Sequence, residues 1–158
     1  MNINNPATDV YLKFYQEHVN QWRHYESQRA AVAGSILAIA TALIGLVTFD
    51  KLITRSDLPL TLLIAVLGIL GALFSAKQHE RACLHMERAR HYRSAIDATF
   101  ENSPLSKIKT EADRVHSMKF RKLQEVKVNI LWRWFYLLLS VIGISLTVFA
   151  MWAPAVAA

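Results

Sequence analysis

A stretch of basic and aromatic residues directly after the apolar run 58–76 offers the residue types best suited to chemistry. Arg81, His85, Arg88 and Tyr92 recur at steps of four, three and four, so a helix would carry them on one face. This pattern suits a phosphate, a nucleotide ligand or an anionic lipid headgroup. The alternative interpretation is a polar face that is solvated or packed between helices, within a general excess of positive charge.

The same stretch lacks the spacing of a metal site or a catalytic centre. His79, His85 and His91 fall six residues apart, about 240° around a helix, whereas two histidines that share a metal need i, i+4 spacing. The chain contains no Gly-rich phosphate loop, no G-x-S-x-G and no H-E-x-x-H. A HEPN-type ribonuclease spacing, with His five to seven residues after Arg, is also missing. We therefore expect no enzyme, no metal or other cofactor, and no nucleic-acid partner.

The elements that carry these residues are predicted from hydropathy. The chain has 158 residues, of which 53% are hydrophobic, and its apolar residues gather in runs at 30–49, 58–76 and 130–153. Each run is long enough to cross about 30 Å of hydrocarbon at about 1.5 Å per residue. None contains Asp, Glu, His or Lys, which argues against an ion-coupled transporter. The sequence predicts an all-α membrane protein with three transmembrane helices.

The distribution of Lys and Arg predicts the orientation. Residues 1–29 and 77–129 contain fifteen of them, whereas the loop 50–57 contains two and the tail 154–158 contains none. Because cytoplasmic segments are enriched in Lys and Arg, we expect the N-terminus inside and the C-terminus outside. Aromatic and Arg side chains favour the boundaries of a span. The predicted interfacial anchors are Trp132, Arg133, Trp134 and Trp152.

The cytoplasmic segments are predicted to form a helical bundle. Residues 1–29 form an amphipathic helix that runs into the first span, with Thr8 and Asp9 as its cap and an aromatic face. Residues 77–129 form a helical hairpin with a turn at 101–105, and its second arm runs unbroken into the third span. The aromatic face comprises Tyr11, Phe14, His18, Trp22 and Tyr25. The apolar seams of the two arms comprise Ala82, Met86, Ala89, Ile96 and Phe100, and Ile108, Ala112, Val115, Met118, Leu123, Val126 and Ile130.

Small and weakly polar residues recur in register within the spans. Faces of this kind allow membrane helices to approach closely, either within one chain or between chains. A weakly polar face can also line a narrow pore in a ring of subunits, although Ser and Thr are equally suited to bonding the preceding turn. The candidate residues for oligomer or pore packing are Gly34, Ala38, Thr41, Gly45, Thr48, Gly68, Ala72, Ser140, Gly143 and Thr147.

This layout resembles known families. A cytoplasmic helix enters a first span, a short outer loop follows, and the second span continues as a charged helix with Arg81, His85, Arg90 and Arg93. The pattern over about residues 10–130 is similar to small SLATT-type membrane effectors of bacterial conflict systems, to RipA-like oligomeric membrane proteins and to accessory membrane proteins of some CRISPR systems. The resemblance implies a bacterial inner-membrane protein that forms an oligomeric channel or perturbs the envelope. The third span departs from the two-span SLATT pattern.

These observations predict a homo-oligomeric small integral membrane protein, as a pore-forming or membrane-perturbing candidate. Its cytoplasmic helices would form a stalk that assembles the oligomer and senses a ligand. The alternative function is an anchored helical adaptor that recruits a cytoplasmic protein through the aromatic face of residues 10–25. The expected partners are membrane lipid and further copies of the chain.

Overall fold

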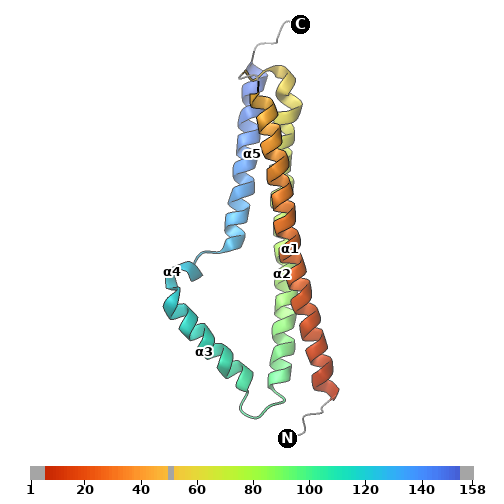
Figure 1. Ribbon diagram of the computed structural model, residues 1–158, viewed down its shortest axis with the longest axis vertical. Coiled ribbons are helices and arrows are strands. Elements are labelled where there is room, and N and C mark those ends of the chain that lie inside the picture. The colour runs from red at the N-terminus through yellow and green to blue at the C-terminus, as the bar shows by residue number, and fades with distance from the viewer. Residues whose placement is uncertain (1–5, 50–51, 154–158) are drawn as a thin grey trace. The chain divides into compact units, whose positions relative to one another are not determined.

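A computed structural model describes residues 6–49 and 52–153, and this part of the chain is helical without strands (Figure 1). The elements in order are α1 (Pro6–Thr48), the 3-10 turn η1 (Arg55–Asp57), α2 (Leu58–Asp97), α3 (Pro104–Lys119), α4 (Arg121–Gln124) and α5 (Val128–Trp152). Three helical segments, 6–48, 55–97 and 128–152, are long and apolar enough to cross a membrane. The predicted all-α chain with three such helices is confirmed.

The first two long helices extend well beyond their apolar stretches. Helix α1 is continuous from Pro6 to Thr48, as the lack of a breaker between residues 10–25 and the first span predicts. Proline suits the first turn of a helix because it has no N–H to leave unpaired. The expected cap is wrong, because Thr8 and Asp9 lie inside the first turn rather than before it. The Asp9 carboxylate there still favours the positive end of the helix dipole.

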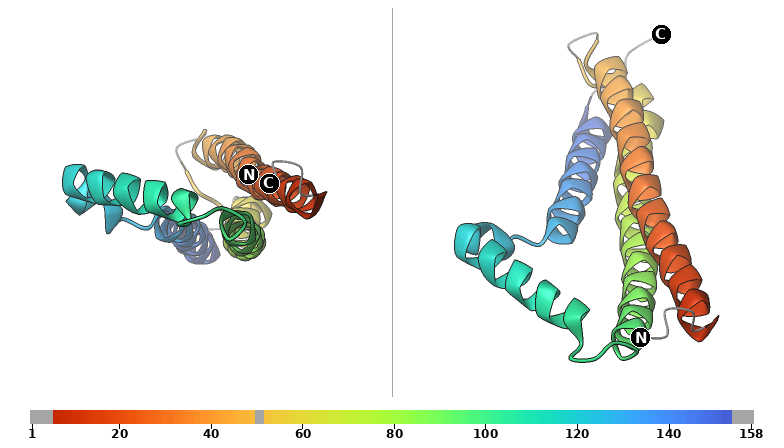
Figure 2. Two further views of the ribbon diagram at one scale, coloured as in Figure 1. Left: turned by 90° about the horizontal axis from the view of Figure 1, so that it is seen from below. Right: turned by 60° about the horizontal axis from the view of Figure 1, so that its bottom comes forward.

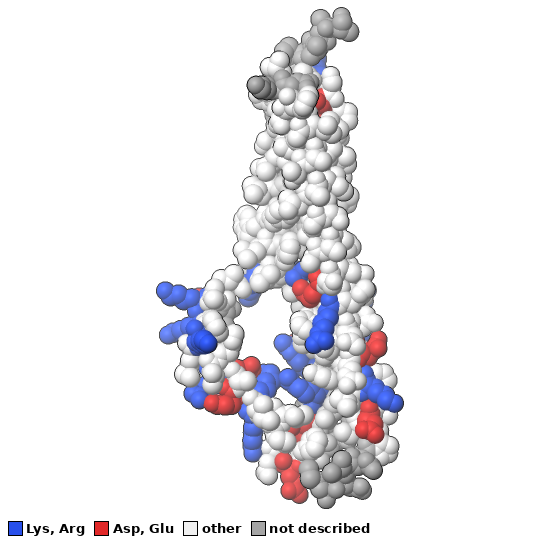
Figure 3. Space-filling model, viewed as in Figure 1, with Lys and Arg blue, Asp and Glu red and all other residues white. Residues whose placement is uncertain are grey.

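The chain divides into two compact units, and α1 and α2 contribute to both. The spanning unit comprises residues 27–78 together with the chain from Val128 onward. The polar unit comprises the chain up to Glu26 together with residues 79–127. Lys, Arg, Asp and Glu side chains gather on the polar unit in the face shown in Figure 3.

The core of the spanning unit lies where α1, α2 and α5 meet. Its buried residues come from all three helices: Ala33, Ile36, Ala40, Ile64, Tyr136 and Leu139. Glycine allows α5 to approach α2 closely. A Cβ added to Gly143 would lie 2.6 Å from the Ala65 Cα, and one added to Gly68 would lie 2.6 Å from the Ser140 backbone nitrogen. Because both neighbours are backbone atoms, only glycine fits these two positions at this helix separation.

The link between α2 and α3 is held by an aspartate. The Asp97 carboxylate accepts hydrogen bonds from the Leu105 N–H at 2.8 Å, from the Ser106 N–H at 3.0 Å and from the Ser106 hydroxyl. The N–H groups of Leu105 and Ser106 are two of those that the first turn of α3 leaves without a helical partner. Asn102 and Ser103 have positive φ, which reverses the chain before Pro104. The turn predicted at 101–105 is therefore present, but it occupies residues 98–103.

The second arm of the predicted hairpin is interrupted, which corrects the prediction of an unbroken helix into the third span. Helix α3 ends at Lys119, α4 spans one turn, and α5 begins at Val128. No Gly or Pro causes the break. The predicted apolar seam is largely uncovered within the described residues, since Ile108, Met118 and Leu123 are 66–67% exposed. Short helices without tertiary packing are marginal, and Figure 2 shows α3 leading away from α2 after the turn.

The first arm packs as predicted at four of its five seam residues, whereas Phe100 is 39% exposed. Ala82, Ala89 and Ile96 are buried, and Met86 is half-buried. The third span is shifted slightly from the expected 130–153, because α5 runs from Val128 to Trp152. The predicted external tail at 154–158 lies outside the described residues.

Candidate functional site

The polar parts of α1 and α2 are joined by a column of stacked rings. The rings come alternately from the two helices: Phe14, Tyr92, His18, His85 and Tyr25. Neighbouring centroids lie 5.4 Å apart for Phe14 and Tyr92, 5.6 Å for Tyr92 and His18, and 5.4 Å for His85 and Tyr25. Steps of four and seven residues on α1 and of seven residues on α2 place these rings on facing stripes.

A pair of histidines lies in the middle of the ring column. The Nδ1 atoms of His18 and His85 are 3.1 Å apart, so one ring donates its N–H and the other accepts. Burial, followed by the charges of His18, Arg88 and Arg81, lowers the pKa of His85, and only Glu17 acts in the opposite direction. The lowered pKa favours the neutral form of His85, whose Nδ1 can take part in this hydrogen bond as donor or acceptor.

The four residues predicted as an anion-binding face are divided by the structure. His85 and Tyr92 contact the rings of α1, whereas Arg81 and Arg88 are exposed. Arg81 also lies 3.9 Å from the Glu80 carboxylate. This is the packing expected of an interhelical polar face, with the two guanidinium groups at its rim.

Metal ligands do not converge within residues 6–49 and 52–153. No group of three or more His, Cys, Asp or Glu side chains is arranged to hold a metal there. The exposed Cys83 thiol lies 3.6 Å from His79 Nε2, one helical turn away. Cys83 and His79 form an i, i+4 pair on α2, which is two side chains and not the three or more of a metal site.

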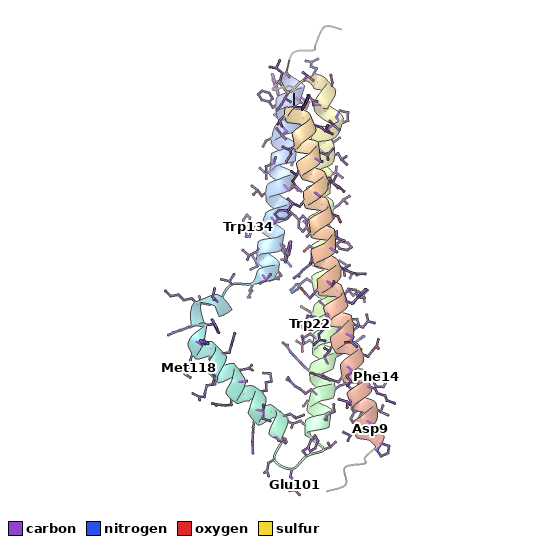
Figure 4. All side chains as sticks on the ribbon, viewed as in Figure 1. Asp9, Phe14, Trp22, Glu101, Met118 and Trp134 are labelled. Atoms are coloured by element: carbon purple, nitrogen blue, oxygen red, sulfur yellow. The ribbon has the colours of Figure 1, made fainter. Side chains whose placement is uncertain are left out.

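The aromatic face of α1 is partly covered by α2, and Phe14 remains 47% exposed. Tyr11 and Phe14 contact the Tyr92 ring, and Tyr25 contacts His85. Trp22, labelled with Phe14 in Figure 4, is half-buried. A partner that docks on this face without displacing α2 would contact Phe14 and the half-buried rings only in part.

The small residues of the first span are uncovered. Gly34, Ala38, Thr41, Gly45 and Thr48 are all exposed, and we call them the α1 stripe. A Cβ added to either glycine would meet nothing within 4 Å. Both threonine hydroxyls donate to the preceding turn of their own helix, each over 2.8 Å. The stripe therefore presents only small side chains, and the hydroxyl hydrogens of Thr41 and Thr48 are already bonded within α1.

The candidate small residues of α2 and α5 pack within the chain. Gly68, Ser140 and Gly143 are buried at the crossing of the two helices, and Ala72 packs against the core. The Thr147 hydroxyl lies 2.8 Å from the Gly143 carbonyl and 3.1 Å from the Thr61 hydroxyl. These side chains already have partners in one subunit.

The predicted interfacial anchors differ in exposure. Trp134 and Trp152 are 66% and 85% exposed, and Arg133 is exposed too. Trp132 is half-buried, and the guanidinium carbon of Arg29 lies 5.9 Å from its ring centroid. The sequence reading did not single out Arg29, which is 6% exposed. Its place as the last charge before the first span was the available signal.

The sequence reading also missed the pairing of His18 with His85 and the capping role of Asp97. Neither residue pair has a local signature, because 67 residues separate the histidines and nine separate Asp97 from Ser106. Within the described residues, the ring column and the α2–α5 crossing are packed inside one chain, whereas the small residues of the α1 stripe are uncovered. Comparison of the chain with protein-family models, curated proteins and solved structures finds no match.

Proposed function

We propose that the chain is a homo-oligomeric integral membrane protein whose subunits associate through the α1 stripe. The observation that carries the proposal is a contrast between glycines. Gly68 and Gly143 are enclosed by backbone of the same chain, whereas Gly34 and Gly45 have nothing within 4 Å of an added Cβ. The first span therefore keeps a close-packing surface that the subunit itself does not use.

The physical reason lies in the membrane as a solvent. Lipid tails are as apolar as the side chains, so helices associate through dispersion and weak hydrogen bonds at close backbone approach. A face of Gly, Ala and Thr permits that approach. Because Thr41 and Thr48 satisfy their donors internally, the stripe loses no hydrogen bonds when a neighbouring helix covers it.

The second candidate is a pore that several such subunits enclose. It is favoured by the position of Thr41 and Thr48, whose side chains are exposed on one face of the first span. Their hydroxyl oxygens retain lone pairs that can accept from water or contact a cation. Ser140 and Thr147 face α2, so α1 would supply the weakly polar lining.

The proposed orientation places the polar unit in the cytoplasm. It is supported by fifteen Lys and Arg residues in 1–29 and 77–129 against two in 50–57. The ring column would then hold α1 and α2 together outside the bilayer. A cytoplasmic ligand that altered this column would change the assembly.

The experiment is the mass of the full chain in mild detergent and in lipid nanodiscs, with the bound detergent or lipid subtracted. We expect one species larger than the monomer. Gly45→Leu, which fills the stripe, should shift it toward the monomer. Leu46→Phe is the matched control, because Leu46 is 63% exposed beside the stripe, and it should leave the mass unchanged. A wild-type monomer in both environments would refute self-association.

A further inference from the structure

A short basic segment lies between α3 and α5. Residues 119–127 contain four cations, Lys119, Arg121, Lys122 and Lys127, against one acid, Glu125. All five residues are exposed. Helix α4 is a single turn inside this segment, and Phe120 with φ −126° and ψ 34° separates it from α3. The break in the predicted hairpin therefore sets off a separate polybasic stretch.

Two cations of α3 pair with acidic side chains of the same helix, unlike those of the basic segment, whose first member Lys119 is the last residue of α3. Lys109 pairs with Asp113, and Arg114 pairs with Glu111 at 2.6 Å. Within the part of the chain that the structure describes, Lys119, Arg121, Lys122 and Lys127 form no ion pair with a carboxylate. The positive charge of 119–127 is thus left for an external partner.

Apolar side chains accompany these free cations. Leu123 is 67% exposed, Val126 is 50% exposed and Phe120 is 37% exposed, and the Lys119 ammonium lies 5.5 Å from the Phe120 ring centroid. Met118, labelled in Figure 4, is 66% exposed at the end of α3. Cations beside exposed apolar groups match the headgroup and upper acyl region of a bilayer.

The covalent chain keeps this segment near a membrane. Residues 125–127 separate α4 from α5, so Gln124 and Val128 can be no more than about 14 Å apart at a maximum of about 3.5 Å per residue. Val128 opens a helix that is apolar enough to span the bilayer. Lys127 directly precedes Val128, so its backbone lies within one Debye length, about 8–10 Å, of the start of that helix.

We propose that residues 119–127 bind anionic lipid headgroups, with Leu123 inserted at the interface. Phosphate or phosphatidyl headgroups would accept hydrogen bonds from Arg121 and from the lysines, while Leu123 enters the acyl boundary. This surface is separate from the α1 stripe and goes beyond self-association. It gives the protein a preference for membranes or membrane regions rich in acidic lipid.

The test uses the full chain with Cys83→Ser, since Cys83 is a free exposed thiol. Leu123→Cys carries an environment-sensitive NBD fluorophore, and Thr110→Cys on the exposed surface of α3 is the reporter control. The protein is placed in phosphatidylcholine nanodiscs with increasing phosphatidylglycerol. We expect a blue shift and quenching by doxyl-labelled lipid at position 123, both rising with phosphatidylglycerol, and neither at position 110.

Matched charge variants then test the cations. The triple variant Arg121→Gln, Lys122→Gln, Lys127→Gln should lower the equilibrium constant for association of the segment with phosphatidylglycerol, measured by the fluorophore at position 123. The expected decrease is about fivefold for each charge removed. Lys107→Gln, Lys109→Gln, Arg114→Gln removes the same number of charges from α3 and should leave that equilibrium constant nearly unchanged. If the two triple variants weaken lipid association equally, overall charge explains the effect and the proposal is overturned.

Two further outcomes also overturn it. The first is a Leu123 reporter that stays in water at every lipid composition. The second is one that responds to phosphatidylcholine alone as strongly as to phosphatidylglycerol. Mass measured on the same nanodiscs reports self-association independently, so failure of lipid binding is distinguishable from failure of the oligomer.

Discussion

Gly143→Ala is the sharpest perturbation of the spanning unit. The new Cβ would lie 2.6 Å from the Ala65 Cα and 2.9 Å from the Ala65 Cβ. Carbon atoms in favourable contact are about 3.5–4.0 Å apart, so α2 and α5 must separate by roughly 1 Å. Because the obstructing atoms include backbone, no rotamer change relieves the overlap.

The expected cost follows from two opposing contributions. Overpacking a fitted site destabilises by about 1–3 kcal/mol, and the higher helix propensity of Ala over Gly returns about 0.8–1.0 kcal/mol. We therefore expect a net loss of up to about 2 kcal/mol in the free energy of unfolding. The separated helices would also lose contacts around Gly68 and Ser140, which form the neighbouring crossing point.

The assay is equilibrium unfolding of the full chain in mixed micelles of mild detergent and dodecyl sulfate, followed by circular dichroism. Gly45→Ala is the control, since its Cβ meets nothing within 4 Å, and it should be neutral or stabilised by up to about 1 kcal/mol. If Gly143→Ala and Gly45→Ala have the same stability, the close crossing of α2 and α5 is refuted.

Three other predictions concern single side chains. Burial and neighbouring positive charges lower the pKa of His85, so the folded state binds fewer protons than the unfolded state, and stability should fall as pH drops below about 6.5. His85→Phe should flatten that dependence in thermal unfolding, and an unchanged pH profile would contradict it. Asp97→Ala should speed amide hydrogen exchange at the start of α3, whereas Asp113→Ala should not, and equal exchange would exclude the cap. The Tyr136 hydroxyl is buried without a partner among the described residues, so Tyr136→Phe should be neutral or stabilise by about 1 kcal/mol, and a clear loss in the micelle unfolding assay would indicate a bonded hydroxyl.

The long helices were predictable from the sequence because their signals are local. The apolar runs set the spans, and the absence of Gly and Pro after Ala76 allowed α2 to continue to Asp97. The break at Phe120 was not predictable in the same way. Apolar periodicity in 108–130 indicates a helix only if a partner covers the seam, and Ile108 and Leu123 are uncovered.

The candidate sites were only partly predictable, because they depend on how distant segments meet. Periodicity placed His85 and Tyr92 on one face of a helix, but it did not say that His18 and Tyr25 lie opposite. Small residues in register likewise indicate close packing without naming the partner. Gly143 contacts α2 of its own chain while Gly45 faces outward, although both stand in apolar helices of similar composition.

The exposed faces of the spans distinguish a surface suited to lipid from one suited to protein. On α2 and α5 the exposed positions are mostly filled by large apolar side chains, including Leu70, Leu73 and Leu138, which are 56–63% exposed. Such side chains maximise contact with mobile acyl chains. A face of Gly, Ala and Thr forgoes much of that contact and gains only when another helix approaches closely. The α1 stripe is thus the exposed face of the spanning unit on which we propose that a second subunit packs.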